Sequence, residues 1–265
     1  GYTFKGWARS STSTSVELTP DEYLSAGYNS NTAYDTKIVI KGNTIYCYFS
    51  GILYATYTDN NMLTGNKVGL HSKAPYASFS DVSLSVTPEV QTAKTLVIGH
   101  SYMELWTNYK NDLSNFEDVY NIGIGGSVSF DWNDMEENVA AYSPTTLIFM
   151  IGINDFPRGL SPEEIANNVR TLLINLKAKV PTLEEVALVS INRTVTHDQF
   201  KAQIETTNNL YRNIVNDLSY VHYADVDNAF LTNGTPDAKY FTDGLHPTAA
   251  SYSYIVDAIE KALGR

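Results

Sequence analysis

An apolar run gives way to a polar pair at Thr95-Leu96-Val97-Ile98-Gly99-His100-Ser101. Short apolar runs of this kind are typical of strands that are buried on both faces, and the residues that follow have the periodicity of a helix. The same alternation repeats along the rest of the chain. We predict strands at 95–99, 119–122, 145–151, 186–191 and 221–226, and helices at 102–113, 129–142, 162–180, 198–218 and 249–263. This alternation predicts an α/β fold, with a parallel sheet covered by helices on both faces.

The helix predicted at 162–180 has the clearest start signal. Ser161-Pro162-Glu163-Glu164 has the spacing of a capping box, with proline at the first helical position. Five apolar residues then fall on one face of the helix: Ile165, Val169, Leu172, Leu173 and Leu176. We therefore expect an amphipathic helix that buries this face.

The first 88 residues have a different pattern. Short alternating runs at 36–40, 44–49, 52–57, 67–71 and 76–86 are separated by turn signals such as Lys41-Gly42-Asn43 and Ser50-Gly51. They predict a meander of antiparallel strands without a helix. We therefore predict two domains, a β-rich domain at 1–88 and an α/β domain at 93–265.

The charge is unevenly divided between these two parts. The 265 residues carry 18 basic and 29 acidic side chains, for a net charge of -11. Residues 1–88 carry 6 of each sign, whereas residues 89–265 carry 12 basic and 23 acidic side chains. An acidic chain without a basic patch is a poor partner for a polyanion, so we exclude nucleic acid as a partner.

Further classes are excluded by the cysteine count and the hydropathy. Cys47 is the single cysteine, which excludes a disulfide scaffold and a zinc ribbon. No apolar stretch approaches the roughly 20 residues that span a bilayer, so we expect no membrane span. The chain begins at Gly1 without a methionine, and we interpret it as a processed or trimmed chain that has lost a signal peptide. We therefore expect a bacterial protein that is secreted, periplasmic or exposed at the cell surface.

Four short motifs lie at the ends of predicted strands, at the edge where open α/β sheets bind ligands. In the first motif, Ser101 follows the strand 95–99 at the start of a helix, where free N–H groups and the helix dipole favour a developing oxyanion. The alternative role for this serine is a helix N-cap. In the second motif, the glycines within 121–127 let the backbone approach a ligand, although a flexible turn explains them equally well.

The third and fourth motifs add an amide and a carboxylate–histidine pair. Asn154 ends the most apolar predicted strand, and its amide can donate to an oxyanion, with an Asn/Asp turn as the alternative. Asp243 lies three residues before His246 across a turn that contains glycine. Its carboxylate can reach one ring nitrogen and leave the other nitrogen to deprotonate a serine. Three other histidines have no such neighbour and are interpreted as surface or strand residues: His71, His197 and His222.

Taken together and in this order, the four motifs resemble those of the SGNH hydrolase superfamily, also called the GDSL esterases and lipases. The resemblance covers residues 93–263. It implies a flavodoxin-like three-layer α/β/α hydrolase domain with a parallel sheet. It also implies that Ser101 is the nucleophile and that His246 and Asp243 complete a catalytic triad, with no metal ion and no cofactor.

The resemblance further implies an oxyanion hole. Its donors would be the N–H of Ser101, Gly126 and the side chain of Asn154. Gly126 is chosen because it lies five residues after Asn121, as in the second block of the family, and Gly125 is the alternative.

One position departs from the family pattern. The first block of the family normally has Gly-Asp-Ser, whereas this chain has Gly99-His100-Ser101. The missing acid is not a member of the triad, so the chemistry does not depend on it. We expect His100 either to brace the turn that carries the nucleophile or to contact the substrate.

These residues predict a serine esterase that hydrolyses O-acyl esters, in particular acetyl esters on carbohydrates. Residues 42–45, 49–53, 67–70 and 77–82 resemble the closing strands of laminin-G or concanavalin-like β-sandwiches, which often accompany glycan-active enzymes. Such a sandwich is here either truncated at Gly1 or completed by the second domain. Three aromatic residues near the site are candidates for stacking on a sugar ring, although aromatic residues in helices often lie in the core: Tyr102, Trp106 and Trp132.

Two alternatives stay open because a fold alone does not define a substrate. A GDSL-type lipase or acyl-thioesterase on short acyl esters would use the same motifs, although residues 192–197 are polar and no strongly apolar lid is found. The other alternative is a catalytically inactive protein that binds glycans through its β-rich part. In each case the partner is an acylated small molecule or a glycan.

Overall fold

The computed structural model describes residues 35–41, 44–49, 51–58 and 92–265. The chain divides into two compact units, Gly1–Val90 and Gln91–Arg265. The predicted strands at 67–71 and 76–86 lie outside the described residues.

The described part of the first unit is a three-stranded antiparallel sheet. Its strands are β1 (Thr36–Lys41), β2 (Thr44–Phe49) and β3 (Ile52–Thr58), in the order β1-β2-β3. The pairing shifts register between Cys47 and Tyr48, where β2 contacts β3. The meander predicted for these strands is therefore confirmed, whereas the laminin-G or concanavalin-like sandwich stays a prediction.

The second unit is built on a parallel five-stranded sheet with the order β5-β4-β6-β7-β8. Its strands are β4 (Thr95–Gly99), β5 (Val119–Asn121), β6 (Thr146–Met150), β7 (Glu185–Val189) and β8 (Val221–Ala224). A two-stranded hairpin, β9 (Leu231–Thr232) and β10 (Thr235–Pro236), is separate from this sheet. The order corresponds to the flavodoxin-like 2-1-3-4-5 arrangement, in which the strand order reverses between β4 and β6. The prediction of an α/β fold with a parallel sheet is confirmed.

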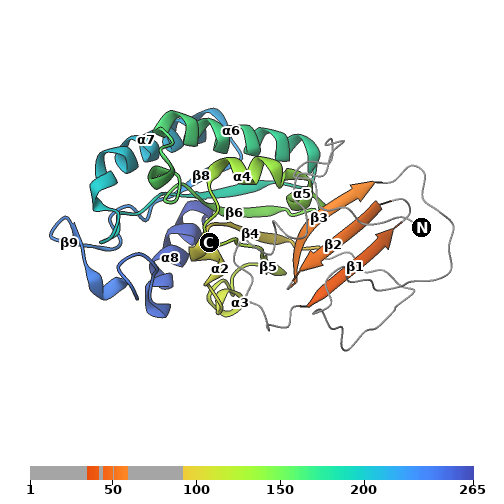
Figure 1. The fold of residues 1–265 in the computed structure, drawn as a ribbon, viewed down its shortest axis with the longest axis horizontal. Helices are drawn as coiled ribbons and strands as arrows, with labels where there is room; N and C mark the ends of the chain where they lie inside the picture. The colour runs from red at the N-terminus through yellow and green to blue at the C-terminus, as the bar shows by residue number, and fades with distance from the viewer. Residues whose placement is uncertain (1–34, 42–43, 50, 59–91) are drawn as a thin grey trace, which may run out of the picture. The chain divides into compact units, whose positions relative to one another are not determined.

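Helices cover the sheet of the second unit on both sides (Figure 1). One side carries α4 (Ser129–Asp134), α5 (Glu136–Ala141), α6 (Pro162–Lys179) and α7 (Lys201–Asp217). The other side carries α2 (Ser101–Glu104), α3 (Tyr109–Asp112) and α8 (Tyr252–Leu263). Short 3-10 turns lie at η1 (Phe156–Arg158), η2 (Asp198–Phe200), η3 (Ala238–Tyr240) and η4 (Ala249–Ser251). The capping box predicted for α6 is present, since the Ser161 hydroxyl accepts from the Glu164 N–H and the Glu164 carboxylate accepts from the Ser161 N–H.

Two helices are shorter than the sequence pattern predicts. The helix predicted at 102–113 is split into the single turns α2 and α3, and the segment between them lets the indole of Trp106 donate to Asp112 at 2.7 Å. The helix predicted at 129–142 is split at Met135, which has φ -92° and ψ 3° and ends α4. In both segments, local side-chain contacts and backbone geometry override the apolar period.

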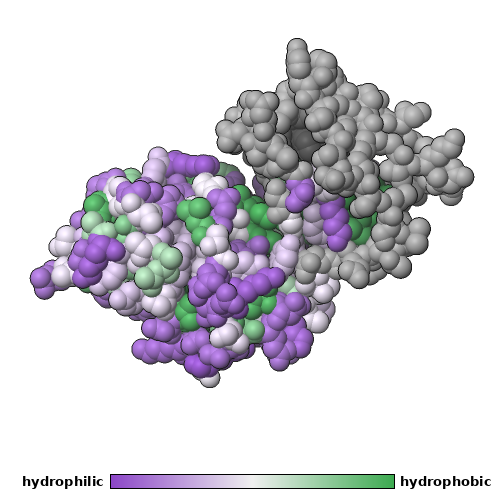
Figure 2. All heavy atoms as spheres, turned by 90° about the horizontal axis from the view of Figure 1, so that it is seen from below, coloured by the Kyte–Doolittle hydropathy of each residue, from purple (hydrophilic) through white to green (hydrophobic). Residues whose placement is uncertain are grey.

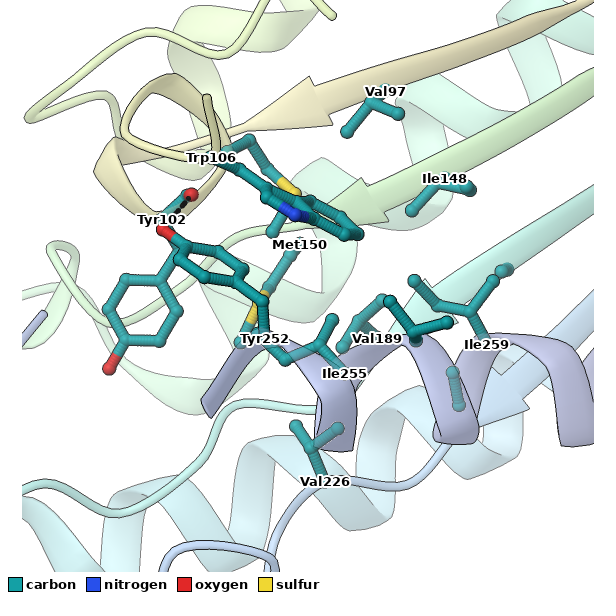
Figure 3. Packing of buried hydrophobic residues seen from close by; sticks show 14 of the residues in the cluster. Val97, Tyr102, Trp106, Ile148, Met150, Val189, Val226, Tyr252, Ile255 and Ile259 are labelled. Carbon is teal, nitrogen blue, oxygen red and sulfur yellow. Dashed lines mark hydrogen bonds between the residues drawn. The ribbon is translucent and has the colours of Figure 1, made fainter. Parts of the chain in front are cut away.

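The buried side chains of α2 and α8 form one cluster against the sheet, and the partly buried Tyr109 of α3 packs against it (Figure 3). Trp106 stacks on Tyr252 of α8, with ring centroids 5.1 Å apart and an interplanar angle of 15°. Both rings face Val97 and Met150 on neighbouring strands. This packing fixes α2 and α8, the two helices that flank the polar motifs, on the same sheet.

Few large apolar side chains are exposed among the residues that the structure describes. Hydrophilic side chains predominate on the face drawn in Figure 2, and apolar side chains form small separate groups there. None of the helices in the described ranges combines the length and the apolar character needed to cross a bilayer.

Candidate active site

The turn after β4 carries the first motif. Gly99 has φ +143°, and a Cβ atom there would lie 2.0 Å from the carbonyl oxygen of Met150 on β6. Only glycine allows the two strands to approach so closely at this point. The His100 N–H then donates to the same carbonyl at 3.2 Å, and the chain enters α2 at Ser101. The Ser101 side chain is thereby placed beside the point where the strand order reverses.

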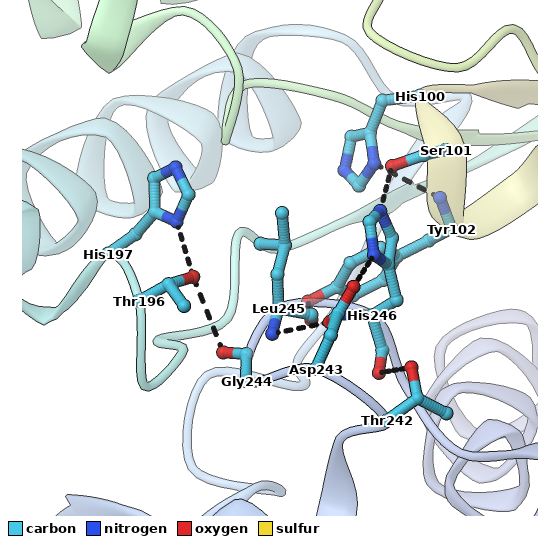
Figure 4. Close-up of polar contacts among 10 residues, drawn as sticks. All are labelled: His100, Ser101, Tyr102, Thr196, His197, Thr242, Asp243, Gly244, Leu245 and His246. Atoms are coloured by element: carbon cyan, nitrogen blue, oxygen red, sulfur yellow. Dashed lines mark hydrogen bonds and ion pairs between the residues drawn. The ribbon is translucent and has the colours of Figure 1, made fainter.

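Three polar side chains from distant parts of the chain meet at this turn (Figure 4). The Nε2 atom of His246 lies 3.0 Å from the Oγ atom of Ser101, and its Nδ1 atom lies 2.7 Å from Oδ2 of Asp243. The other carboxylate oxygen of Asp243 accepts from the N–H groups of Leu245 and His246, at 3.0 and 2.8 Å. The contact with the His246 side chain and these two N–H donors hold the pKa of Asp243 well below its usual range. The carboxylate stays ionised and fixes the imidazole.

Free backbone N–H groups lie at this edge of the sheet. Within the described residues, the N–H groups of Ser101, Gly125 and Gly126 have no hydrogen-bond acceptor. Gly126 adopts φ +73°, and a Cβ atom at this position would meet no atom within 4 Å. The Asn154 amide donates one hydrogen to the carbonyl of Ser127 at 3.1 Å, which leaves its second N–H available. Three donors thus come from the loops after β4, β5 and β6.

Three side chains that follow β6 hold the segment that follows β5. In addition to the Asn154 contact, the Arg158 guanidinium donates to the carbonyl of Gly126 at 3.0 Å. The Asp155 carboxylate accepts from the backbone N–H and the hydroxyl of Ser129, at 2.9 and 2.5 Å. Burial raises the pKa of Asp155 to about 6, against the effect of the two Ser129 donors. The two loops that supply Gly126 and Asn154 are therefore fixed to each other.

His100 is buried beside the nucleophile turn. It is the N-cap of α2, and its Nδ1 atom accepts from the Tyr102 N–H at 3.3 Å. Burial, together with the neighbouring His246, lowers the pKa of His100 to about 3, so its imidazole is neutral. Of the two predicted roles, the structure supports bracing of the turn. Contact with the substrate is not supported, because only 1% of the residue is exposed.

The prediction that three aromatic side chains stack on a sugar ring is wrong, because all three are at most 1% exposed. The Tyr102 hydroxyl donates to the carbonyl of Leu245, the Trp106 indole packs on α8, and the Trp132 indole donates to the hydroxyl of Ser127. They are core residues whose polar atoms bind other parts of the protein. Their position beside the motifs suggested exposure, but their large apolar rings are better buried than solvated.

Two residues of the site were not identified from the sequence. Arg158 is four residues after Asn154, and an exposed arginine gives no signal in the sequence that it binds the carbonyl of Gly126. Asn192 is 90 residues from Tyr102 in the chain, and its amide donates to the Tyr102 hydroxyl at 3.3 Å. In the sequence, only its position directly after the strand predicted at 186–191 indicated that Asn192 lies near the site. Within the ranges described above, no group of three histidine, cysteine, aspartate or glutamate side chains is arranged to hold a metal ion.

A five-stranded parallel sheet with a serine, a histidine and an aspartate in contact at its carboxyl edge defines an α/β protein of the hydrolase type. The sequence model of the GDSL-like Lipase/Acylhydrolase family matches residues 92–254. The chain therefore belongs to the GDSL-like lipase/acylhydrolase family, and it is an ester hydrolase. No curated protein matches the chain.

Solved structures share this fold at low sequence identity. A GDSL-like lipase from Bacteroides thetaiotaomicron is 20% identical, with 64% of this chain and 88% of that chain covered and a TM-score of 0.54. A catalytic mutant of Axe2, an acetylxylan esterase from Geobacillus stearothermophilus, is 18% identical, with 66% and 96% covered and a TM-score of 0.55. A carbohydrate esterase of family 3 from Talaromyces cellulolyticus is 20% identical, with 65% and 96% covered and a TM-score of 0.51. At this identity the similarity establishes the fold alone.

Proposed function

We propose that this chain is a serine esterase in which Ser101 is the nucleophile, His246 the general base and Asp243 the residue that orients the base. The observation that carries the proposal is the unbroken contact from the Ser101 hydroxyl through both ring nitrogens of His246 to the Asp243 carboxylate. A serine hydroxyl is a weak nucleophile until an adjacent base accepts its proton. Here the base lies within hydrogen-bond distance before any substrate is bound.

The reaction follows from this order of contacts. His246 accepts the proton of Ser101 on Nε2 while Oγ attacks the carbonyl carbon of an ester. The Asp243 carboxylate, held by two backbone N–H groups, stabilises the imidazolium that forms. His246 then gives the proton to the leaving alcohol. Water, deprotonated by the same nitrogen, hydrolyses the acyl-enzyme and releases the carboxylic acid.

The charge that develops on the carbonyl oxygen needs donors that are already in place. We assign this role to the N–H groups of Ser101 and Gly126 and to the side-chain amide of Asn154. The two N–H groups have no other acceptor in the described part of the chain, and the amide retains one free hydrogen. Donors fixed in advance require no reorganisation during the reaction, and loss of one such donor typically costs about 10²- to 10³-fold in turnover.

For the substrate, we propose O-acetyl groups on carbohydrates. Two proteins that share the fold are named as an acetylxylan esterase and as a carbohydrate esterase. The charge of -11, which lies wholly on residues 89–265, disfavours anionic phospholipid surfaces and leaves neutral acylated glycans as the better substrates.

The test is a panel of acetylated oligosaccharides and of aryl esters with increasing acyl length, assayed with the wild type and with Ser101→Ala. We expect the highest kcat/KM for acetyl esters and loss of activity in the variant. A preference for long acyl chains would contradict the carbohydrate assignment and favour a GDSL-type lipase. Full activity of Ser101→Ala would contradict the mechanism, and absence of activity in the wild type on every ester would favour a binding protein.

A further inference from the structure

Tyr102 links the residue after the nucleophile to the residue before the base. Its hydroxyl donates to the carbonyl of Leu245 at 2.6 Å, although 143 residues separate the two in the chain. Tyr102 directly follows Ser101, and Leu245 directly precedes His246. The Tyr102 bond therefore runs alongside the contact between Ser101 and His246.

The hydroxyl of Tyr102 has a defined direction. The Asn192 amide donates to its oxygen at 3.3 Å, so the hydroxyl proton is left to point at the Leu245 carbonyl. Burial raises the pKa of Tyr102 far above its usual value, which keeps the hydroxyl protonated. The backbone of Tyr102 is fixed as well, because the Tyr252 hydroxyl donates to its carbonyl at 2.7 Å.

The loop that carries His246 has few other ties to the nucleophile turn. Among the described residues, the Tyr102–Leu245 and Ser101–His246 contacts are the only hydrogen bonds between residues 101–104 and residues 242–247. The loop is also held from another side, since the Thr196 N–H donates to the Gly244 carbonyl at 3.1 Å and the Leu245 side chain packs against the buried cluster. The part-buried Tyr102–Leu245 bond is the backbone restraint that ties the loop to α2 itself.

We propose that Tyr102 is a positioning residue, whose hydroxyl holds the His246 loop at the distance from which Nε2 reaches Ser101. This inference rests on the proposed function, since it concerns the same serine and histidine. The hydroxyl does not touch substrate or the reacting atoms. It acts by restricting the loop, and a displacement of about 1 Å at a catalytic group can cost about 10²-fold in rate.

The test compares Tyr102→Phe, which keeps the ring and removes only the hydroxyl, with Tyr220→Phe. The Tyr220 hydroxyl also donates to a backbone carbonyl, that of Leu173 at 3.0 Å, but it lies before β8 at the opposite edge of the sheet. We measure the rate at which a small fluorophosphonate labels the serine, kcat and KM for 4-nitrophenyl acetate over a range of pH, and the melting temperature.

For Tyr102→Phe we expect labelling rate and kcat to fall by about 10- to 100-fold, with KM changed less than about twofold and the shape of the pH profile unchanged. Tyr220→Phe should lose a comparable amount of thermal stability and keep its labelling rate. Wild-type labelling and kcat in Tyr102→Phe would overturn the inference. So would a raised KM at unchanged kcat, which would indicate contact with the substrate.

A second variant covers the case in which Tyr102→Phe does not fold. Asn192→Asp conserves volume and replaces the donor by an acceptor, which draws the hydroxyl proton away from Leu245. It should lower the labelling rate as well, and wild-type labelling would overturn the inference. Failure of the proposed function is distinct, because then the serine is not labelled even in the wild-type protein.

Discussion

The Nε2 atom of His246 lies 3.0 Å from the Oγ atom of Ser101, although 145 residues separate them in the chain. The sheet order produces this contact, because Ser101 follows the strand β4 beside the point where the order reverses. His246 lies in the loop before α8, which packs on the same side of the sheet as α2. The sheet order and the packing of α8 therefore bring the Nε2 and Oγ atoms within hydrogen-bond distance.

Asp243→Asn should lower catalytic activity strongly and leave the stability of the protein nearly unchanged. The amide cannot stabilise the imidazolium, so we expect kcat/KM to fall by about 10²- to 10⁴-fold. Because the side chain is exposed, the melting temperature should change little. Steady-state kinetics on an aryl acetate and a thermal melt check both outcomes. A loss of activity smaller than tenfold would mean that Asp243 does not act on His246 in catalysis.

Gly126→Ala and Gly125→Ala should distinguish the two candidate oxyanion glycines. A Cβ atom at Gly126 meets no neighbour, but its φ of +73° is unfavourable for alanine and would shift the N–H. We expect a loss of about 10²-fold in kcat for Gly126→Ala. A Cβ atom at Gly125 would lie 2.3 Å from a carboxylate oxygen of Glu104, the mobile end of an exposed side chain. The loss for Gly125→Ala should be much smaller, and the reverse order would assign the donor to Gly125.

His100→Asn should change the acid stability of the protein. Burial lowers the pKa of His100 from 6.5 to about 3, so the unfolded chain takes up a proton in this interval and the folded protein does not. The stability that the neutral imidazole contributes is present above pH 6.5 and is lost as the pH falls toward 3. The difference in unfolding free energy between wild type and variant should therefore shrink by about 1.4 kcal/mol per pH unit below that point.

Urea unfolding of both proteins at several pH values measures this slope. Near neutral pH, His100→Asn should lower the unfolding free energy more strongly than it lowers kcat, because His100 acts on the turn through the Tyr102 N–H. A pH-independent difference in unfolding free energy, or a large loss of turnover with unchanged melting, would contradict the bracing role.

Asp155→Asn should have the opposite pH dependence. The pKa of Asp155 is raised from 3.8 to about 6, so its contribution to stability is complete below 3.8 and is lost as the pH rises through 6. The comparison uses the unfolding free energy of Asp155→Asn minus that of wild type. This difference should be more positive at neutral pH than near pH 4, by about 2 to 3 kcal/mol. Ser161→Ala is a control, because loss of this exposed cap costs about 1 kcal/mol without a link to Asp155. An Asp155→Asn difference that does not vary with pH would mean that folding does not raise the pKa of Asp155.

Much of the second unit could be predicted from the sequence. Strand β4 and helix α6 have unambiguous signals, in an unbroken apolar run and a capping box, and the structure contains both. The residues of the first three motifs meet because the carboxyl ends of parallel strands lie at one edge. Asp243 and His246 lie well beyond β8, in the loop before α8, and their contact with Ser101 depends on the packing of α8 against the sheet.

The rest depends on contacts that no local pattern encodes. Tyr102 follows the nucleophile, which suggested contact with substrate, but its hydroxyl binds Leu245 across 143 residues of chain. The helix expected at 102–113 is broken between α2 and α3, where the Trp106 indole binds Asp112, and a helical period does not report such a bond. The contact of Asp155 with Ser129 joins residues 26 positions apart and could be found only in the fold.

The central claim is that Ser101 is a nucleophile activated by His246, and mass spectrometry after reaction with a fluorophosphonate tests it most directly. In the folded wild-type protein we expect one adduct, on the peptide that contains Ser101. Labelling should be abolished in Ser101→Ala and reduced by at least about 10³-fold in rate in His246→Ala. An unlabelled Ser101 in the folded protein, or labelling that is equally fast without His246, would contradict the account.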